Sequence, residues 1–201
     1  MQKKIVIGMT GASGVRYGIR LLEALEGIEE THLILSKEAR ELIEIETDVQ
    51  VSDLIQKATF HYEDDDFMAP VASGSYRFDA MVIVPCTMKT LSGVANGYAD
   101  TLIGRAADVA LKEGRRLILV PREMPLSLVH LENMVKACRA GCVVMPACPG
   151  FYNRPRTIDD LVDNVVGRIL DQLGIDNSLY QRWGEKGKKH DVLPSTPHRI
   201  R

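Results

Sequence analysis

The sequence has few cysteines, few aromatic residues and almost no net charge. Four of its 201 residues are cysteine, 5% are aromatic, and the formal net charge is -2. The lack of a basic excess argues against a nucleic-acid partner. The cysteines have neither Cys-x-x-Cys spacing nor a histidine at metal-ligand spacing, so we interpret them as small buried thiols in a reducing compartment. They are Cys86, Cys138, Cys142 and Cys148.

Long hydrophobic runs are absent as well. The apolar run that follows the N-terminal MQKK is too short for a signal peptide or a membrane span. We therefore expect a cytoplasmic protein without a membrane span. The length favours one domain with a full core, which we place at residues 1–185. Residues 186–201 are polar and basic, and we expect a disordered tail or an arm laid on a neighbouring subunit.

Short apolar runs alternate with amphipathic helical patterns along the chain. The runs have no polar interruptions, as is typical of strands that are covered on both faces. Val15–Leu25 and Leu161–Leu173 carry apolar residues every three or four positions, which predicts helices. The alternation predicts an α/β fold with a parallel sheet and helices on both faces. The predicted strands are Ile5–Met9, Thr31–Leu35, Ala80–Val84, Leu117–Val120 and Cys142–Met145.

An unusual polar motif follows each predicted strand. In chain order the motifs are TGASG, Ser36-Lys37, PCTMKT, PREMPLS and PACPGFYNRP. The carboxyl ends of parallel strands meet at one edge of a sheet, and open α/β sheets bind their ligands there. We therefore expect a ligand site at this edge. The long segment Lys57–Asp79 is expected to be an irregular lid or binding loop.

These motifs have both binding and structural interpretations. The small residues of TGASG would let the backbone approach an anion at a helix N-terminus, although Ser13 alone is more simply explained as a helix N-cap. Thr87, Lys89 and Thr90 could bind a phosphate or could begin a helix. Arg122 and Glu123 suggest a site, and a structural ion pair would give the same pattern.

Three other polar features have plainer interpretations. Glu46 lies in the charged stretch ELIEIETDV, which by itself indicates a solvated helix face. The run Asp64–Asp66 resembles Mg²⁺-diphosphate sites, but no second acidic cluster stands at helical spacing, so a solvated loop is expected. His130 has no cysteine or acidic constellation around it and is interpreted as structural. No metal site is expected.

A larger set of motifs resembles one known family. The UbiX-type flavin prenyltransferases contain the following stretches of this sequence in the same order: MTGASG, SKEARELIEIETDV, MAPVASGS, VPCTMKTLSGVANGYADTLIGRAADVALKEGR, LVPREMPLSLVHLENM, MPACPGFYNRP, LVDNVVGRILDQLGI and RWGE. The resemblance covers Ile5 to about Glu185. It implies a flavodoxin-like, Rossmann-like fold that assembles as a dodecamer with sites shared between subunits.

The resemblance also implies a reaction. The dimethylallyl group of dimethylallyl monophosphate is joined to N5 of reduced FMN and then to C6, which closes a fourth ring. The prenylated FMN then serves a partner decarboxylase of the UbiD type. Cationic phosphate ligands are abundant in the motifs and a paired acidic motif is lacking, so we expect turnover without a divalent metal.

The resemblance implies an FMN site at the matching positions. Glu46 matches a glutamate near the N5/C6 edge of the flavin. Phe67 stands where the family often has an aromatic wall, and it has a smaller π face than the tryptophan of some relatives. The implied FMN ligands are Gly11, Ala12, Ser13, Ser36, Thr87, Met88, Lys89, Thr90 and Arg122.

The resemblance further implies a site for the prenyl phosphate. Tyr152 and Arg168 match residues that contact this phosphate. Ser13, Lys112 and Glu123 match groups that surround the leaving phosphate and its proton transfers. A dimethylallyl cation needs π faces and the exclusion of water, and a departing phosphate needs cations and hydrogen-bond donors.

Two other functions stay open at this point. FMN-dependent cysteine decarboxylases share the fold and require an asparagine in a Pro-Ala-Ser/Thr-Ala-Asn-Thr motif, where this chain has Lys89. They also use a histidine base that has no evident counterpart here. A non-catalytic flavin carrier is the other alternative. Glu123, Tyr152 and Arg168 lie outside the implied FMN set and argue against a carrier.

Overall fold

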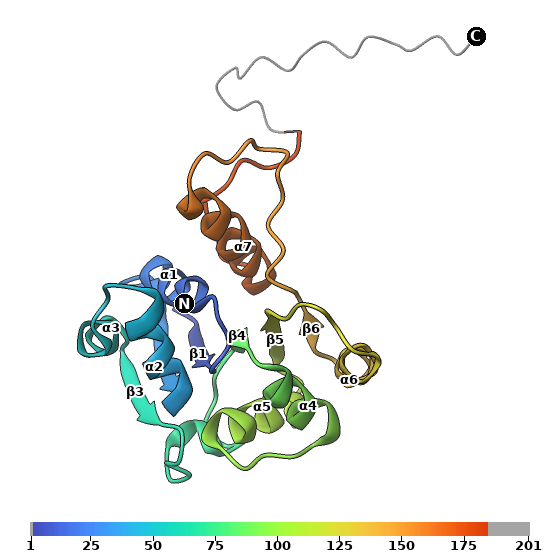
Figure 1. The fold of residues 1–201 in the computed structure, drawn as a ribbon. Helices are drawn as coiled ribbons and strands as arrows, with labels where there is room; N and C mark the ends of the chain where they lie inside the picture. Colours follow the sequence, from blue (N-terminus) through green and yellow to red (C-terminus); the bar gives the residue numbers. More distant parts are fainter. Residues whose placement is uncertain (1, 185–201) are drawn as a thin grey trace.

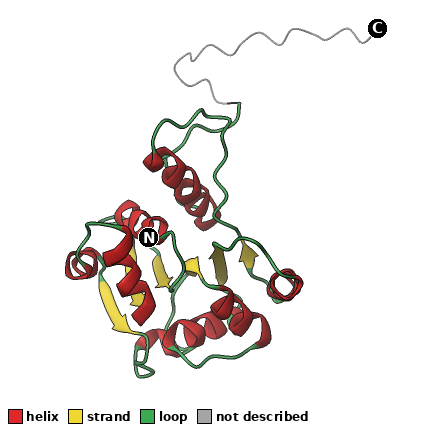
Figure 2. Ribbon diagram, in the orientation of Figure 1, coloured by secondary structure: helices red, strands yellow, loops and turns green. Residues whose placement is uncertain are grey.

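The computed structural model describes residues 2–184, so the tail expected at residues 186–201 lies outside the described residues. Within this range an open six-stranded sheet lies between two layers of helices (Figures 1 and 2). The strands are β1 (Lys4–Met9), β2 (Glu30–Leu35), β3 (Phe60–Glu63), β4 (Ala80–Cys86), β5 (Arg116–Pro121) and β6 (Val143–Val144). The helices are α1 (Val15–Leu25), α2 (Lys37–Glu46), α3 (Val51–Lys57), α4 (Met88–Asn96), α5 (Leu102–Lys112), α6 (Leu128–Arg139) and α7 (Ile158–Leu173), with a 3-10 turn η1 (Pro70–Ala72).

The described strands all pair in parallel, in the order β3-β2-β1-β4-β5-β6. The five strands that the sequence predicts are β1, β2, β4, β5 and β6, and taken alone they have the flavodoxin order 2-1-3-4-5. Adding β3 at the outer edge gives the order 3-2-1-4-5-6 of dinucleotide-binding sheets. The predicted α/β fold, a parallel sheet with helices on both faces, is confirmed.

The outermost strands are where prediction and structure differ. β3 lies inside Lys57–Asp79, which the sequence analysis expects to be irregular. It pairs only with β2, and Phe60 is 46% exposed, so β3 lacks the continuous apolar run of a covered strand. At the other edge β6 is shorter than predicted, although the Met145 N–H still donates to the Leu119 carbonyl at 2.8 Å.

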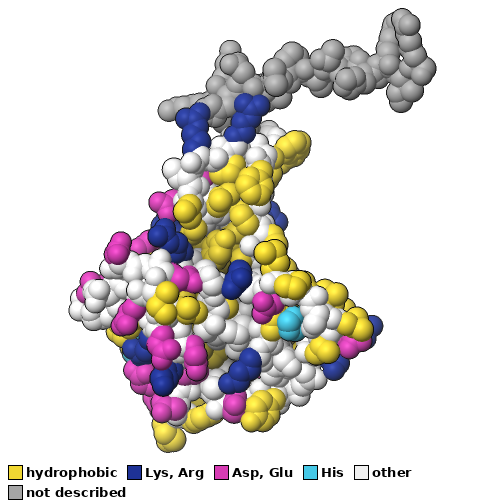
Figure 3. All heavy atoms as spheres, in the orientation of Figure 1, with side chains coloured by type: hydrophobic (Ala, Val, Ile, Leu, Met, Phe, Trp, Pro, Cys, Tyr) yellow, Lys and Arg dark blue, Asp and Glu magenta, His cyan; other side chains and the backbone are white. Residues whose placement is uncertain are grey.

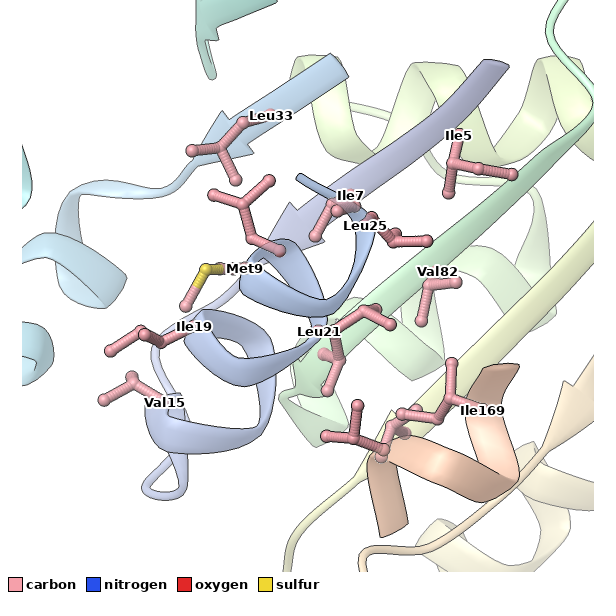
Figure 4. Packing of buried hydrophobic residues seen from close by; sticks show 14 of the residues in the cluster. Ile5, Ile7, Met9, Val15, Ile19, Leu21, Leu25, Leu33, Val82 and Ile169 are labelled. Carbon is pink, nitrogen blue, oxygen red and sulfur yellow. The ribbon is translucent and has the colours of Figure 1, made fainter. Parts of the chain in front are cut away.

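Each face of the sheet has its own apolar core. Side chains alternate along β1, so that Ile5 and Ile7 enter one core and Val6 enters the other. Figure 4 shows the first core, in which Val15 and Ile19 of α1 lie near the side chains of β1. The second core lies beneath α4, α5 and η1. Because both faces are covered, the central strands are apolar throughout, which is the signal that made them predictable.

Helix α7 projects with its flanking loops away from the rest of the structure (Figure 1). It begins with a capping box in which Thr157 Oγ1 accepts from the Asp160 N–H at 3.1 Å and Asp160 Oδ2 accepts from the Thr157 N–H at 3.0 Å. The helix therefore begins three residues before the stretch Leu161–Leu173 that the sequence predicts. Arg20 of α1 donates to Asp163 of α7 at 2.6 Å and joins the projection to the sheet layer.

The four cysteines divide into two pairs. Cys86 and Cys142 are buried free thiols, as predicted, and burial raises the pKa of Cys142 to about 11. Cys138 and Cys148 are exposed, so the prediction of buried thiols is wrong for them. They lie at the end of α6 and in the loop after β6, where less structure covers them. Among the described residues, no helix is both long and apolar enough to span a membrane.

His32 of β2 is a fully buried histidine with polar partners at both ring nitrogens. Nε2 lies 3.0 Å from the Glu30 carboxylate, which can only accept, so Nε2 carries the proton. Nδ1 then accepts from the Tyr62 hydroxyl at 3.1 Å. The ring also stacks on Phe60, with the centroids 5.0 Å apart. Burial lowers the pKa of His32, and the Glu30 carboxylate offsets only part of this effect.

We predict that His32 makes the protein less stable at acidic pH. Its pKa in the folded state lies below the unfolded value of about 6.5, so the unfolded chain binds the proton first. The His32 contribution to the free energy of unfolding is therefore fully present above about pH 6.5 and declines below it, by up to about 1.4 kcal/mol per pH unit.

Urea titrations of the wild type and of His32→Gln between about pH 7.5 and pH 5.5 measure this effect. The variant should be less stable near neutrality but should lose less stability on acidification. His61, whose pKa is also lowered by burial, titrates in both proteins, so the variant keeps a shallow slope. Identical slopes for the two proteins would contradict the prediction.

Candidate active site

The carboxyl ends of the parallel strands meet at one edge of the sheet, and a cavity of about 970 Å³ opens there. It is bordered by the first residues of α2, α4 and α5. The polar edge predicted from the strand-following motifs is thus hollow enough for a ligand. Five residues of the predicted cofactor set line the cavity: Gly11, Ser36, Thr87, Lys89 and Thr90.

The N-terminus of α4 has hydrogen-bond donors left for an anion. Thr87 is its N-cap, and Thr87 Oγ1 accepts from the Thr90 N–H at 3.1 Å. Neither Met88 nor Lys89 has a partner for its backbone N–H among the described residues. Helix N-termini with unpaired N–H groups bind anions, and the Lys89 side chain adds a positive charge at the same place. The helix-start interpretation of PCTMKT is therefore confirmed, and the same helix N-terminus is open to an anion.

The far side of the cavity is acidic. Asp64 and Asp65 line it together with Glu63. Asp64 is half-buried, and its carboxylate accepts from the Ile103 N–H at 2.9 Å, at the N-terminus of α5. Burial raises the pKa of Asp64 in spite of this hydrogen bond. The expectation of a solvated loop at Asp64–Asp66 is therefore wrong for Asp64, whose side chain is used to begin a helix.

The TGASG turn has a different role from the one that its glycines suggest. Gly14 has a φ of 101°, a left-handed conformation that favours glycine. At Gly11 a Cβ atom would lie 2.4 Å from Glu38 Cβ, so the missing side chain permits close packing of α2. Ser13 is exposed and is not the N-cap of α1, because Gly14 occupies that position. The N-cap interpretation of Ser13 is therefore wrong.

Glu46 occupies the N-terminus of α1. Its Oε2 accepts from the Gly14 N–H at 2.8 Å and from the Val15 N–H at 3.2 Å. The interpretation of Glu46 as part of a solvated helix face is therefore wrong. A carboxylate at a helix N-terminus is stabilised by the helix dipole. It also takes two N–H groups that an incoming phosphate would otherwise use, which makes α4 the better phosphate site.

Arg122 and Glu123 lie beside the TGASG turn without pairing with each other. Arg122 Nε donates to the Ser13 carbonyl at 3.2 Å, and its side chain passes over Gly14. Glu123 accepts from the Met124 N–H at 3.2 Å. Among the described residues no ion pair joins Arg122 to Glu123, so the structural ion-pair alternative is wrong. Both side chains are exposed at the sheet edge.

Tyr152 and Arg168 are close to each other within one chain. The Tyr152 ring meets Trp183 edge-on, with the centroids 5.6 Å apart. The Arg168 guanidinium donates to the Tyr180 hydroxyl at 3.4 Å and lies 3.7 Å from Asp171. The hydrogen bond to Tyr180 raises the pKa of Arg168 most, and Tyr152 contributes as well. Arg168 lines a second cavity, of about 230 Å³, between β6 and α7.

Asp171 holds the segment after α7 against the helix. Its carboxylate accepts from both terminal nitrogens of Arg182, at 2.9 and 2.6 Å, and from the Tyr180 hydroxyl at 2.6 Å. The Asn177 amide donates to it at 3.0 Å. These donors keep the pKa of Asp171 low, although burial alone would raise it. The clamp places Trp183 beside Tyr152.

Other predicted site residues are not brought into either cavity. Lys112 ends α5, which begins at the larger cavity and runs about 16 Å along its 11 residues to the opposite edge of the sheet. There its ammonium pairs with Glu113 at 2.6 Å. Phe67 is 47% exposed in the loop after β3, and Met88 and Ala12 are buried. Within one chain these residues line neither cavity.

The sequence analysis missed Thr10, which ties two motifs together. Thr10 is 4% exposed, donates to the Pro85 carbonyl at 2.9 Å and accepts from the Thr87 N–H at 2.8 Å. It thereby fixes the start of α4 against the end of β1. A threonine that interrupts an apolar run at the end of a strand is the signal that could have found it. His130, interpreted as structural, accepts from the Ser127 N–H in the capping box of α6.

Comparisons with known proteins give relatives over nearly the whole chain. Residues 1–170 match the Flavoprotein family. The flavin prenyltransferase UbiX of Methanocaldococcus jannaschii is 54% identical over 90% of this chain and 98% of that protein. The structure of AnUbiX in complex with FMN and dimethylallyl pyrophosphate is 46% identical, with a TM-score of 0.90 over 93% of this chain and 100% of that one.

Two further solved structures bear on the alternatives. A dodecameric FMN-dependent UbiX-like decarboxylase from Escherichia coli O157:H7 is 50% identical, with a TM-score of 0.88 over 90% of this chain and 100% of that one. The FMN-dependent cysteine decarboxylase TvaF is 20% identical, with a TM-score of 0.57 over 72% of this chain and 90% of that one. The second likeness is one of fold alone.

The contact between Glu46 and α1 predicts a measurable effect on stability. Glu46→Ala should lower the free energy of unfolding by about 1 kcal/mol, because the Gly14 and Val15 N–H groups lose their acceptor. Glu44 provides a matched control, since it is exposed on the same helix and makes no hydrogen bond among the described residues. Glu44→Ala should change stability by less than about 0.5 kcal/mol. Urea denaturation measures both free energies of unfolding. Equal effects of the two substitutions would support the interpretation of Glu46 as part of a solvated helix face.

Proposed function

The chain belongs to the UbiX family of flavin prenyltransferases, and we propose that it joins the dimethylallyl group of dimethylallyl monophosphate to reduced FMN at the sheet edge described above. The observation that carries the placement is the N-terminus of α4, which offers unpaired N–H groups and Lys89 beside the larger cavity. This arrangement suits the phosphate of FMN. Of the residues implied by the family resemblance, Gly11, Ser36, Thr87, Lys89 and Thr90 line this cavity, and Arg168 lines the smaller one next to α7.

The residues at this edge fit FMN in size and in chemistry. A cavity of about 970 Å³ lies at the upper end of the range of about 300–1,000 Å³ that small-molecule sites occupy. The Thr87 and Thr90 hydroxyls and the Met88 and Lys89 N–H groups would hold the phosphate, and Arg122 would hold the flavin beside the TGASG turn. Reduced FMN would supply the nucleophilic N5 and C6 atoms. Inorganic phosphate would be the leaving group when the prenyl carbon bonds to N5.

Tyr152 and Arg168 would bind the prenyl phosphate. The guanidinium donates several N–H groups in a fixed geometry, and the phenol adds one more donor. Both side chains are exposed in the single chain, and Arg168 lines the smaller cavity. Their positive charge and hydrogen bonds would stabilise the negative charge that accumulates on the departing phosphate. The aromatic face of Phe67 would stabilise the allylic positive charge.

Glu46, Ser13 and Glu123 would supply the acid-base groups. Glu46 is held by two backbone N–H groups, so its carboxylate has a fixed position at the turn. From there it could accept a proton or stabilise positive charge on the ring that is alkylated. Arg122 donates to the Ser13 carbonyl and is followed in the chain by Glu123, so the exposed Ser13 hydroxyl and the Glu123 carboxylate could pass a proton to the leaving phosphate.

Lys112 would enter the site from another subunit. Within one chain it lies at the opposite edge of the sheet, so only a neighbouring copy can bring it to the phosphate. A shared site would also exclude water from groups that are exposed in the single chain. Figure 3 shows apolar side chains gathered over the projection formed by α7 and its loops. We propose a homo-oligomer of this kind, a dodecamer like the relative from Escherichia coli.

The product recipient we propose is a UbiD-type decarboxylase, as the family resemblance implies. The cysteine decarboxylase alternative has only a likeness of fold in its support, and Lys89 stands where that group needs asparagine. A non-catalytic flavin carrier would have no use for Tyr152 and Arg168, which lie outside the FMN set, or for the second cavity that Arg168 lines. Prenyl transfer is therefore the function best supported.

Mass spectrometry of the flavin tests the function directly. After anaerobic incubation with reduced FMN and dimethylallyl monophosphate, the flavin should have gained one dimethylallyl group. EDTA should leave the yield unchanged, because the cationic side chains, and not a metal, neutralise the phosphate. An unmodified flavin would refute the function. Loss of activity in EDTA that Mg²⁺ restores would refute its independence of metal.

Tyr152→Phe and Arg168→Ala should separate the two phosphates. Each variant loses charge-assisted or hydroxyl hydrogen bonds to the prenyl phosphate, which should lower kcat/KM for dimethylallyl monophosphate roughly ten- to a hundredfold. Binding of FMN should be unchanged, since the α4 residues hold its phosphate. Flavin titration and prenylation kinetics of each variant measure the two effects. Weakened FMN binding with normal prenylation kinetics would mean that the two phosphates are assigned the wrong way round.

A further inference from the structure

We infer that Asn164 is the positioning residue that fixes the Tyr152 loop against the Arg168 helix. The inference rests on the proposed function, in which Tyr152 and Arg168 bind one phosphate. Asn164 is a polar residue in the otherwise apolar buried face of α7, and its side chain is 5% exposed. A polar side chain is costly to bury unless it makes a hydrogen bond, so its bonding partner explains why it is there.

That partner is the loop that carries Tyr152. The backbone N–H of Gly150 donates to Asn164 Oδ1 at 2.9 Å. A backbone N–H can only donate, so the atom facing it must be the amide oxygen, and the orientation of the Asn164 amide is fixed. Among the described residues, no other hydrogen bond joins residues 148–153 to α7. The attachment of this loop to the helix therefore depends on one side chain.

Gly150 transmits the attachment to Tyr152. A Cβ atom placed on Gly150 would lie 3.1 Å from Cε1 of the Tyr152 ring and 3.8 Å from Asn164 Oδ1, so the glycine contacts both side chains closely. The ring is also held edge-on by Trp183. Holding the Gly150 backbone in place therefore holds the phenol, which follows two residues later.

Arg168 lies one helical turn after Asn164. Residues four apart share a face of a helix, and both residues line the cavity of about 230 Å³ between β6 and α7. The hydrogen bond to Gly150 thus sets the spacing between the phenol and the guanidinium before any phosphate arrives. Without it, the phosphate would have to order the loop as it binds, and its affinity would fall.

Substitutions on either side of Arg168 provide the test. Asn164→Leu keeps the shape but removes the acceptor, whereas Asn164→Asp keeps an oxygen at the same place. Gln172→Leu is the matched control, because Gln172 lies one turn after Arg168, lines the same cavity, and within the described part of the chain its side chain bonds only to Arg116, at 3.1 Å. The measurements are KM and kcat for dimethylallyl monophosphate at saturating reduced FMN, FMN affinity, and the emission of Trp183, the only tryptophan of the chain.

Asn164→Leu should raise KM for dimethylallyl monophosphate roughly five- to thirtyfold, with FMN affinity unchanged. It should also shift the emission of Trp183, because the ring against which Trp183 lies has moved. Asn164→Asp should recover most of both properties, and Gln172→Leu should stay within about twofold of the wild type. If Asn164→Leu does not fold, Asn164→Ala removes the same acceptor and takes its place.

Two results would overturn the inference. One is an unchanged KM in Asn164→Leu when Tyr152→Phe and Arg168→Ala raise it, which would leave the proposed function intact. The other is an equal loss in Asn164→Leu, Asn164→Asp and Gln172→Leu, which would indicate a general effect on α7. If Tyr152→Phe and Arg168→Ala also leave KM unchanged, the proposed phosphate pair itself fails.

Discussion

The common direction of the strands is the constraint on which the rest of the structure depends. Because the described strands all pair in parallel, each strand ends at the same edge, and each helix that follows directly begins there with unpaired N–H groups. The chain treats these helix N-termini differently. Glu46 neutralises that of α1, Asp64 accepts from the first two N–H groups of α5, and Ser36 and Thr87 cap α2 and α4. The N-terminus of α4 keeps two N–H groups for an anion. The proposed phosphate site thus depends on which helix N-termini the chain leaves open, and at α4 the open N–H groups have the Lys89 side chain beside them.

The sequence was sufficient for the parts of the fold that are covered on both sides. β1, β4 and β5 are apolar along almost their whole length, β2 is apolar in its second half, and their helices have clear stripes, so pattern and structure agree. The strand β3 could not be found in the same way. It is an edge strand whose Phe60 is exposed, and its Phe60 and Tyr62 side chains adjoin a polar cluster around His32. Such a strand has no continuous apolar run from which the sequence could predict it.

The candidate site was predictable as an edge but not as a set of contacts. In a parallel sheet every strand ends at the same edge, so the motifs that follow the strands must lie near one another. The contacts between individual residues could not be predicted in this way. Glu46 was interpreted as solvent-exposed, yet it accepts hydrogen bonds at the N-terminus of α1 from residues 31 and 32 positions away in the sequence. The position of Lys112, at the edge of the sheet opposite the site, also follows from the fold. Helix α5 runs antiparallel to the strands, so its last residue lies far from the edge at which the helix begins.

Several hydrogen bonds join residues that are far apart in the sequence, and this affects the order in which parts of the protein fold. Arg20 and Asp163 are 143 residues apart, and Thr10 bonds to residues 75 and 77 positions later. Such non-local contacts form slowly, because a large loop must close before they are gained. The Asp171 clamp joins α7 to residues up to Arg182, near the end of the described chain. On the ribosome, therefore, the sheet edge proposed for FMN can form before α7, which carries Arg168 of the proposed prenyl-phosphate site, has been made.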